Sequence, residues 1–317
     1  MKSRIIRDDF LKRMVIVAPA RADRPIVPKG AKGKADCPFC EQHEFMTPPE
    51  SIVVGRKEDR PNQSGWQIRV FPNLYPIVSN AFEDSGYGYH DLIVETPIHD
   101  ENFAMLRDQT IENIFIIVKK LFKTYKKDPK IQSTLFFKNH KSQAGASIEH
   151  PHSQTLAIAS KLPLVEAELK EAAKFFKKRN YCYFCDQIRL SQLEKRMIGI
   201  NDSFILFTPI VQRFRHESWI MPIRHSSRFE LCHDSEFLAL AKVLKFKLTQ
   251  LQALESDCPF NIILYNGPVS LENDDCYHWR LEILPRIERI AAFEINSNIY
   301  INSLTSIESA ELLRKGV

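Results

Sequence analysis

The segment KNHKSQAGASIEHPHSQ, residues 138–154, carries the most specific pattern in this chain of 317 residues. His150 and His152 are two positions apart, so a strand would turn both imidazoles to the same face. One of them can then bind a metal while the other faces an adjoining pocket. Gln154 continues that face and offers an amide N–H to a phosphoryl oxygen. Since a neutral imidazole is a competent nucleophile near neutral pH, the segment predicts that His152 attacks phosphorus.

Small residues precede the two histidines and predict a phosphate-binding loop. Gly145 lets the backbone approach an anion closely, and the Ser147 hydroxyl adds a donor. Asn139 follows a short apolar strand and is expected to face this loop, although an isolated asparagine is more often a turn residue. The alternative for the whole segment is a strand that binds metal without any catalysis.

Each half of the chain contains the same three landmarks in the same order. They are a Cys-x-x-Cys pair, two histidines nine positions apart around an apolar strand, and a strand ending in asparagine that leads to a histidine. In the first half these residues are Cys37, Cys40, His90, His99, Asn139 and His150; in the second half they are Cys182, Cys185, His216, His225, Asn266 and His278. The repetition predicts a tandem duplication of one α+β unit, with domains at residues 1–178 and 179–317.

The two Cys-x-x-Cys pairs predict metal sites. Chance gives only about 0.15 such pairs for this cysteine content, and two thiolates on one tight turn suit tetrahedral zinc. The repetition nominates His99 and His150 as the remaining ligands of the first site, and His225 and His278 as those of the second. Four protein ligands leave no position for substrate, which predicts structural metals: zinc in the first site and zinc or iron in the second. A redox dithiol is the alternative for each pair, and an ordinary buried or surface residue is the alternative for each single histidine.

The second half has an arginine where the first half has its nucleophile. The run His278-Trp279-Arg280-Leu281-Glu282 stands in the place of residues 150–154. Arginine is cationic at any physiological pH and cannot attack phosphorus. One active site per chain is therefore expected.

Hydrophobic periodicity predicts an α+β fold in which groups of strands precede and follow long helices. Helical spacing covers residues 108–126, 162–178, 234–254 and 307–315. Short β-rich runs cover residues 14–17, 92–94, 134–137, 204–207, 261–265, 279–284 and 291–295.

Bulk properties argue against several classes of protein. The net charge of +5 is mild and no long run of like charges occurs, so no nucleic-acid partner is expected. No apolar window of about 18 residues occurs, and charges interrupt the N-terminus too early for a signal peptide, which predicts a cytoplasmic protein without a membrane partner. The odd number of cysteines, 7, argues against a disulfide framework.

The run at residues 138–154 resembles the active-site signature of the galactose-1-phosphate uridylyltransferase family, which includes ADP-glucose phosphorylase-like relatives within the histidine-triad superfamily. The likeness extends over most of the chain and includes residues 14–19 with Arg21, 37–40, 71–76 and 90–99. It implies two tandem histidine-triad-like lobes, each an antiparallel sheet with packed helices and a metal site. It also implies a homodimer whose active sites lie near the interface.

The same resemblance implies a double displacement on a nucleotide sugar. His152 attacks the α-phosphorus and expels sugar 1-phosphate, and the nucleotidyl-histidine then passes its group to sugar 1-phosphate or orthophosphate. Gln154 and Ser147 would hold phosphoryl oxygens in this reaction. The other substrate contacts that the resemblance and the loop together indicate are Asn139, Asn73, Arg21, Gly145 and Glu294.

Three positions depart from the pattern of well-known uridylyltransferases. In those enzymes, a lysine and a glutamine near this segment hold the hexose phosphate. Counting from Glu294, the resemblance places Glu288 and Ile301 of this chain at the same two positions. Ser153 stands in place of a glycine, and all three differences favour phosphorylase-like members. The first expectation is a hexose-1-phosphate uridylyltransferase, with a nucleotide-sugar phosphorylase as the alternative. A histidine-triad hydrolase and a catalytically silent, zinc-stapled binding module are the remaining hypotheses.

Overall fold

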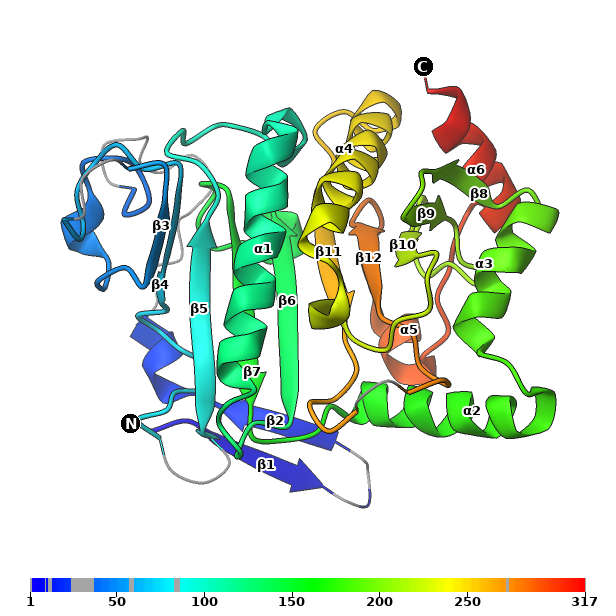
Figure 1. Ribbon diagram of the computed structural model, residues 1–317, viewed down its shortest axis with the longest axis horizontal. Helices are drawn as coiled ribbons and strands as arrows, with labels where there is room; N and C mark the ends of the chain where they lie inside the picture. The colour runs from blue at the N-terminus through cyan, green and yellow to red at the C-terminus, as the bar shows by residue number, and fades with distance from the viewer. Residues whose placement is uncertain are drawn as a thin grey trace.

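The computed structural model describes residues 2–8, 10, 13–23, 37–56, 60–82, 86–271 and 274–316. Within them, one antiparallel sheet runs through the whole molecule in the order β3-β4-β5-β7-β6-β11-β12-β10-β9-β8 (Figure 1). The strands from the first half of the chain are β3 (Ile52–Val54), β4 (Ile68–Pro72), β5 (Gly88–Val94), β6 (Ser133–His140) and β7 (His152–Ile158). Those from the second half are β8 (Met197–Ile200), β9 (Phe204–Phe207), β10 (Ser218–Pro222), β11 (Phe260–Tyr265) and β12 (Arg280–Pro285).

The two halves of the sheet have the same topology. Read from the outer edge inward, the first half runs β3-β4-β5-β7-β6 and the second half runs β8-β9-β10-β12-β11. The halves join where β6 pairs with β11, with Phe136 opposite Leu264 and Asn139 opposite Asn261. The predicted α+β fold with antiparallel sheets is confirmed, and the two sheets are fused into one. The domain boundary at residues 178 and 179 stays a prediction.

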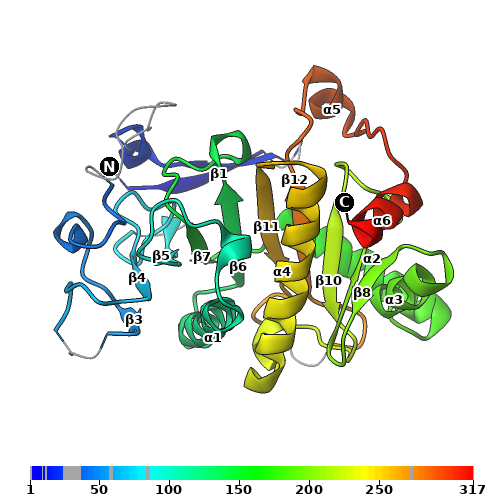
Figure 2. The same cartoon turned by 90° about the horizontal axis from the view of Figure 1, so that it is seen from above.

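Helices α1 (Asp108–Tyr125) and α4 (Phe237–Leu254) pack side by side on one face of the sheet, one over each half (Figures 1 and 2). Both were predicted from apolar residues at helical spacing, and the side chains at that spacing are buried. The rings of Phe115 in α1 and Phe237 in α4 stack with centroids 6.4 Å apart. This shared layer places the hydrophobic core between α1, α4 and the sheet.

The opposite face of the sheet differs between the halves. In the second half it is covered by α2 (Pro163–Arg179) and α3 (Tyr183–Leu193), while α6 (Ser306–Lys315) packs against α4 and β8. In the first half the Cys37–Cys40 turn and Phe39 lie over part of this face. Strands β1 (Arg4–Asp8) and β2 (Arg13–Val17) form a separate hairpin. Among the described residues, none of the helices has the length and apolarity needed to cross a membrane.

The strand predicted at residues 291–295 is wrong, because this segment is helix α5 (Ala292–Ser297). The Ala291 N–H donates to Glu294 Oε2 at 3.0 Å, which satisfies a helix N-terminus, and Asn298 ends the helix at φ 54°. Local capping therefore outweighs the apolar, β-prone composition of the segment. Helix α3, which the periodicity did not reveal, begins inside the second Cys-x-x-Cys turn.

Candidate active site

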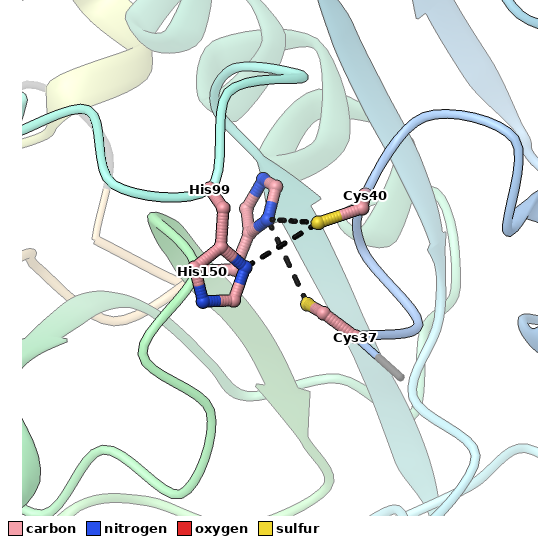
Figure 3. Close-up of side chains that lie close together, drawn as sticks. All are labelled: Cys37, Cys40, His99 and His150. Atoms are coloured by element: carbon pink, nitrogen blue, oxygen red, sulfur yellow. Dashed lines mark hydrogen bonds between the residues drawn. The ribbon is translucent and has the colours of Figure 1, made fainter. Parts of the chain in front are cut away.

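The first Cys-Cys-His-His group is assembled from segments that are far apart in the sequence. Cys37 and Cys40 lie on one turn, His99 follows β5, and His150 precedes β7. Their ligand atoms all lie within 4.8 Å of one another, and the four side chains converge in Figure 3. Cys40 Sγ is 3.3 Å from His99 Nδ1 and 3.6 Å from His150 Nδ1. Two sulfurs and two imidazole nitrogens in this arrangement form a donor set that suits tetrahedral zinc.

Hydrogen bonding and burial prepare His150 as a ligand. Its Nε2–H donates to the Thr96 carbonyl at 2.7 Å, so the lone pair is on Nδ1, which faces the sulfurs. Burial lowers the pKa of His150 to about 4, which keeps the ring neutral. Burial also raises the pKa of the Cys37 thiol to about 12, and a bound cation would reverse that shift because it favours the thiolate.

The second group repeats this arrangement. Cys182, Cys185, His225 and His278 bring their ligand atoms within 4.8 Å of one another. His225 Nδ1 is 3.2 Å from Cys185 Sγ, and its Nε2–H donates to the Asp274 carbonyl at 2.8 Å. The hydrogen bond with Cys185 lowers the pKa of Cys182. The prediction of two Cys-Cys-His-His groups is confirmed.

His152 is the first residue of β7 and lies beside the first group without belonging to it. Its Nδ1 is 2.8 Å from the His150 carbonyl oxygen. A carbonyl can only accept, so Nδ1 carries the proton and the lone pair is on Nε2. The ring of Phe39, from the Cys-x-x-Cys turn, packs edge-on 5.3 Å from the His152 ring and 6.1 Å from the His150 ring. The Cys37–Cys40 turn therefore also supports the ring of His152.

One detail of the predicted strand needs correction. The sequence places His150 and His152 on one strand, but β7 begins only at His152. Pro151 has no N–H for the ladder, and this explains why the strand starts after it. His150 is consequently on the preceding loop, where its ring reaches the sulfurs.

A buried ion pair lies behind His152, on the α1 face of the sheet. Lys138 Nζ is 2.5 Å from Glu95 Oε2, and both side chains are at most 1% exposed. The same ammonium donates to the His152 carbonyl at 3.1 Å. Burial raises the pKa of Glu95, and the Lys138 charge opposes that shift. The pair thus anchors the backbone of His152.

Gln154 shares the face of His152, and His90 determines which way its amide points. The Ile77 N–H donates to His90 Nδ1 at 3.0 Å, so the His90 proton is on Nε2. His90 Nε2 lies 2.9 Å from Gln154 Oε1 and donates to it. Asn73 Nδ2 is 3.3 Å from the same His90 nitrogen. The Gln154 oxygen is therefore engaged by His90, and its NH₂ group is the end that remains to bind an anion.

The remaining predicted substrate residues lie around two turns and in α5. Arg21 donates from Nη1 to the Tyr75 carbonyl at 2.9 Å, next to the Asn73 turn. Asn139 is the penultimate residue of β6, and the loop after this strand contains Gly145 at φ 89° and Ser147. Glu294 lies in α5, and its described hydrogen bond caps its own helix.

In the second half, the residue aligned with His152 is enclosed. Arg280 is buried and forms ion pairs with Glu168 of α2 and Glu282, each at 2.7 Å. Its guanidinium lies 4.1 Å from the ring centroid of Tyr265 and 4.6 Å from that of Trp219. Ion pairs and cation–π contacts thus enclose the Arg280 side chain.

Sequence reasoning missed the roles of His90, Glu95 and Lys138. His90 appeared only as a landmark of the repeat, and Lys138 only as part of the quoted run. The signal for the ion pair was an acid and a base at two otherwise apolar strand ends. Nothing in the linear sequence indicates that they meet.

Comparison with known proteins finds two family models and full-length relatives. A family model described as "Domain of unknown function (DUF4921)" matches residues 102–315, and one described as the N-terminal domain of DUF4931 matches residues 27–160. ADP-glucose phosphorylase from Arabidopsis thaliana is 29% identical, with 98% of this chain and 92% of that protein covered. Galactose-1-phosphate uridylyltransferase from Thermotoga maritima is 23% identical, with 95% and 94% covered.

Two solved structures resemble the whole chain. The crystal structure of the Arabidopsis thaliana ADP-glucose phosphorylase with bound ADP-glucose has a TM-score of 0.81 at 28% identity, with 99% of each chain covered. A structure of uridylyltransferase has a TM-score of 0.83 at 27% identity, with 100% of this chain and 98% of that chain covered.

Proposed function

The chain belongs to the DUF4921 family and to the wider galactose-1-phosphate uridylyltransferase family with its ADP-glucose phosphorylase relatives, and on that premise we propose that it transfers a nucleotidyl group through His152. The donor is a nucleotide sugar and the acceptor is a phosphate. The observation that carries the proposal is the 2.8 Å hydrogen bond between His152 Nδ1 and the His150 carbonyl. It fixes the tautomer in which Nε2 bears the nucleophilic lone pair.

In the first step, His152 Nε2 forms a bond to the α-phosphorus of the nucleotide sugar. The bond from that phosphorus to the bridging oxygen breaks, and sugar 1-phosphate leaves with the electron pair. The imidazole becomes cationic, and the carbonyl oxygen of His150 stabilises the charge by accepting from Nδ1–H. Gln154 donates its amide N–H to a phosphoryl oxygen, and Ser147 and Asn139 supply further donors from the loop.

In the second step, an oxygen of the acceptor phosphate attacks the same phosphorus and the P–N bond breaks. The electron pair returns to His152 Nε2 and regenerates the neutral ring. The nucleotide is thereby transferred without hydrolysis, as in a double displacement. Asn73 and Arg21, which are joined through the Tyr75 turn, are proposed to contact the nucleotide.

We favour orthophosphate as the acceptor, which makes the reaction a phosphorolysis of the ADP-glucose phosphorylase type. Glu288 stands where the sequence resemblance expects a lysine for the hexose phosphate. Its carboxylate accepts from Arg215 at 2.5 Å, and Arg215 also pairs with Glu255 at 3.3 Å. One guanidinium between two carboxylates leaves these three groups net negative, so this position supplies an acid in place of the cation expected for gripping a hexose phosphate. Hexose 1-phosphate is the second candidate acceptor, since the chain also resembles uridylyltransferases throughout.

The donor set of each Cys-Cys-His-His group fits zinc, and we propose two structural zinc ions per chain. In the first site Cys37, Cys40, His99 and His150 would hold the ion. A bound zinc there would fix His150 and the Phe39 turn against the nucleophile. The attack on phosphorus itself involves only His152 and the donors around it.

Intact-mass spectrometry after incubation with ADP-glucose alone or UDP-glucose alone tests the mechanism. A gain equal to AMP or UMP identifies both the adduct and the base. The adduct is expected to disappear in His152→Gly and to persist in His233→Gly, a matched control that removes an exposed imidazole elsewhere. Phosphorus-31 NMR of products formed with orthophosphate or galactose 1-phosphate then identifies the acceptor. Undiminished turnover in His152→Gly would refute the proposal.

A further inference from the structure

Asn261 joins the half of the chain without a nucleophile to the catalytic loop. It lies in β11 directly opposite Asn139 in β6, and its side chain is only 7% exposed. Its Nδ2 donates to Asn139 Oδ1 at 2.8 Å and to the Ala144 carbonyl at 2.8 Å. One side-chain amide therefore ties together the end of β6 and the turn that precedes Gly145.

The direction of these hydrogen bonds is fixed by a cation. Arg286, which follows β12, donates from Nη1 to Asn261 Oδ1 at 3.1 Å. A guanidinium can only donate, so the oxygen of Asn261 must face Arg286 and its NH₂ group must face the loop. The Arg286 guanidinium is itself held 4.9 Å from the ring centroid of Phe214.

The same logic continues to Asn139. Because Asn261 donates to its oxygen, the other end of the Asn139 amide, Nδ2, faces the glycine turn. A Cβ added to Gly145 would lie 3.8 Å from this nitrogen, and Gly145 adopts φ 89°. The chain from Arg286 through Asn261 to Asn139 thus presents an N–H donor, rather than a carbonyl oxygen, beside the loop expected to bind phosphate.

We infer that Asn261 and Arg286 are positioning residues for nucleotidyl transfer, acting through Asn139 and the 142–145 turn on the phosphates. The inference rests on the proposed function. It gives the second half of the chain a role in the reaction: its innermost strand, β11, selects which end of the Asn139 amide meets the anion. A flipped amide would place an oxygen against a phosphoryl oxygen, where like partial charges repel.

The discriminating variant is Asn261→Asp. A carboxylate accepts from Arg286 and also from Asn139 Nδ2, so it turns the Asn139 oxygen towards the loop. The rate of nucleotidyl-His152 formation is expected to fall about 100-fold, the usual consequence of losing one oriented donor. Ile263→Ala, two residues along the same face of β11, is the matched control. It should lower the melting temperature while leaving the rate within about twofold, as expected for a loss of apolar packing that removes no hydrogen bond between Arg286, Asn261 and Asn139.

A double-mutant cycle separates positioning from general destabilisation. If Asn261 acts through Asn139, then Asn261→Ala slows adduct formation much less in the Asn139→Ala background than in the native chain. Equal slowing in both backgrounds, or an unchanged rate in Asn261→Asp while the native chain forms the adduct, would overturn the inference alone. Absence of any adduct in the native chain would overturn the proposed function as well.

Discussion

Replacing Lys138 by methionine should separate two contributions of the buried ion pair: its contribution to the stability of the fold, and its role in holding the backbone of His152. The change leaves the Glu95 carboxylate without its cation in an environment that is 0% exposed. Removing one partner of a buried pair costs about 3–5 kcal/mol. For 317 residues, an unfolding entropy of about 2.1 cal/mol/K per residue converts this cost into a fall in melting temperature of about 4–8 °C.

The pH dependence of the loss follows from Glu95. Burial already raises the pKa of Glu95, and removing the Lys138 charge raises it further. A carboxyl with a folded-state pKa above its unfolded value destabilises the fold as pH rises through that range. The fall in melting temperature caused by Lys138→Met should therefore be smallest near pH 5 and grow towards pH 8. Thermal denaturation across that range measures it.

Adding Glu95→Gln to Lys138→Met provides the control. The double variant has no charge left at this buried position, so most of the lost stability should return and its pH dependence should disappear. Adduct formation should stay slow, because the hydrogen bond from Lys138 to the His152 carbonyl is still missing. Recovery of both stability and rate would show that the lysine has no positioning role. A melting temperature of Lys138→Met equal to that of the native chain would refute the buried-pair argument.

Three further outcomes are expected. Elemental analysis should find about one zinc fewer per chain in Cys40→Ser and in Cys185→Ser than in the native chain. The rate of adduct formation should fall more in Cys40→Ser, because the turn that contains Cys40 contacts His152. Burial lowers the pKa of Lys247 to about 7, so the unfolded chain binds this proton more tightly than the folded chain does. The free energy of unfolding should therefore fall as pH falls from about 10 to 7. Lys247→Met should flatten this pH dependence in urea titrations. Arg280→His should give no second adduct by intact mass, since Glu168 and its neighbours enclose that position, and should lower the melting temperature instead.

The candidate metal ligands and reactive residues could be predicted from the sequence, but the residues that hold them in place could not. Cys-x-x-Cys turns identify two ligands of each Cys-Cys-His-His group locally, and the repeat along the chain identifies the two distant histidines. The long helices α1 and α4 follow from their apolar spacing. Segment 291–295 was mispredicted because an N-terminal cap and the left-handed Asn298 decide its conformation, and composition does not reveal them.

Hydrogen-bond directions within the site could not be predicted. The tautomer of His152 depends on a neighbouring carbonyl, and that of His90 depends on the Ile77 N–H from another turn. The link between Asn261 and Asn139 depends on the register of β6 against β11, which is set by the tertiary packing of the two halves. The sequence identifies the candidate groups, and the strand register determines how their hydrogen-bonding atoms are oriented.

The pairing of β6 with β11 also has consequences for how the duplicated chain could have evolved and for how its halves behave when they are separated. Each half, expressed alone, would present its innermost strand as a bare edge with unpaired N–H and C=O groups, a template for aggregation. An ancestral single unit would have needed a second copy at that edge. The two copies joined here meet that need within one chain, so cutting the chain between them is expected to yield fragments that precipitate separately but reassemble when refolded together.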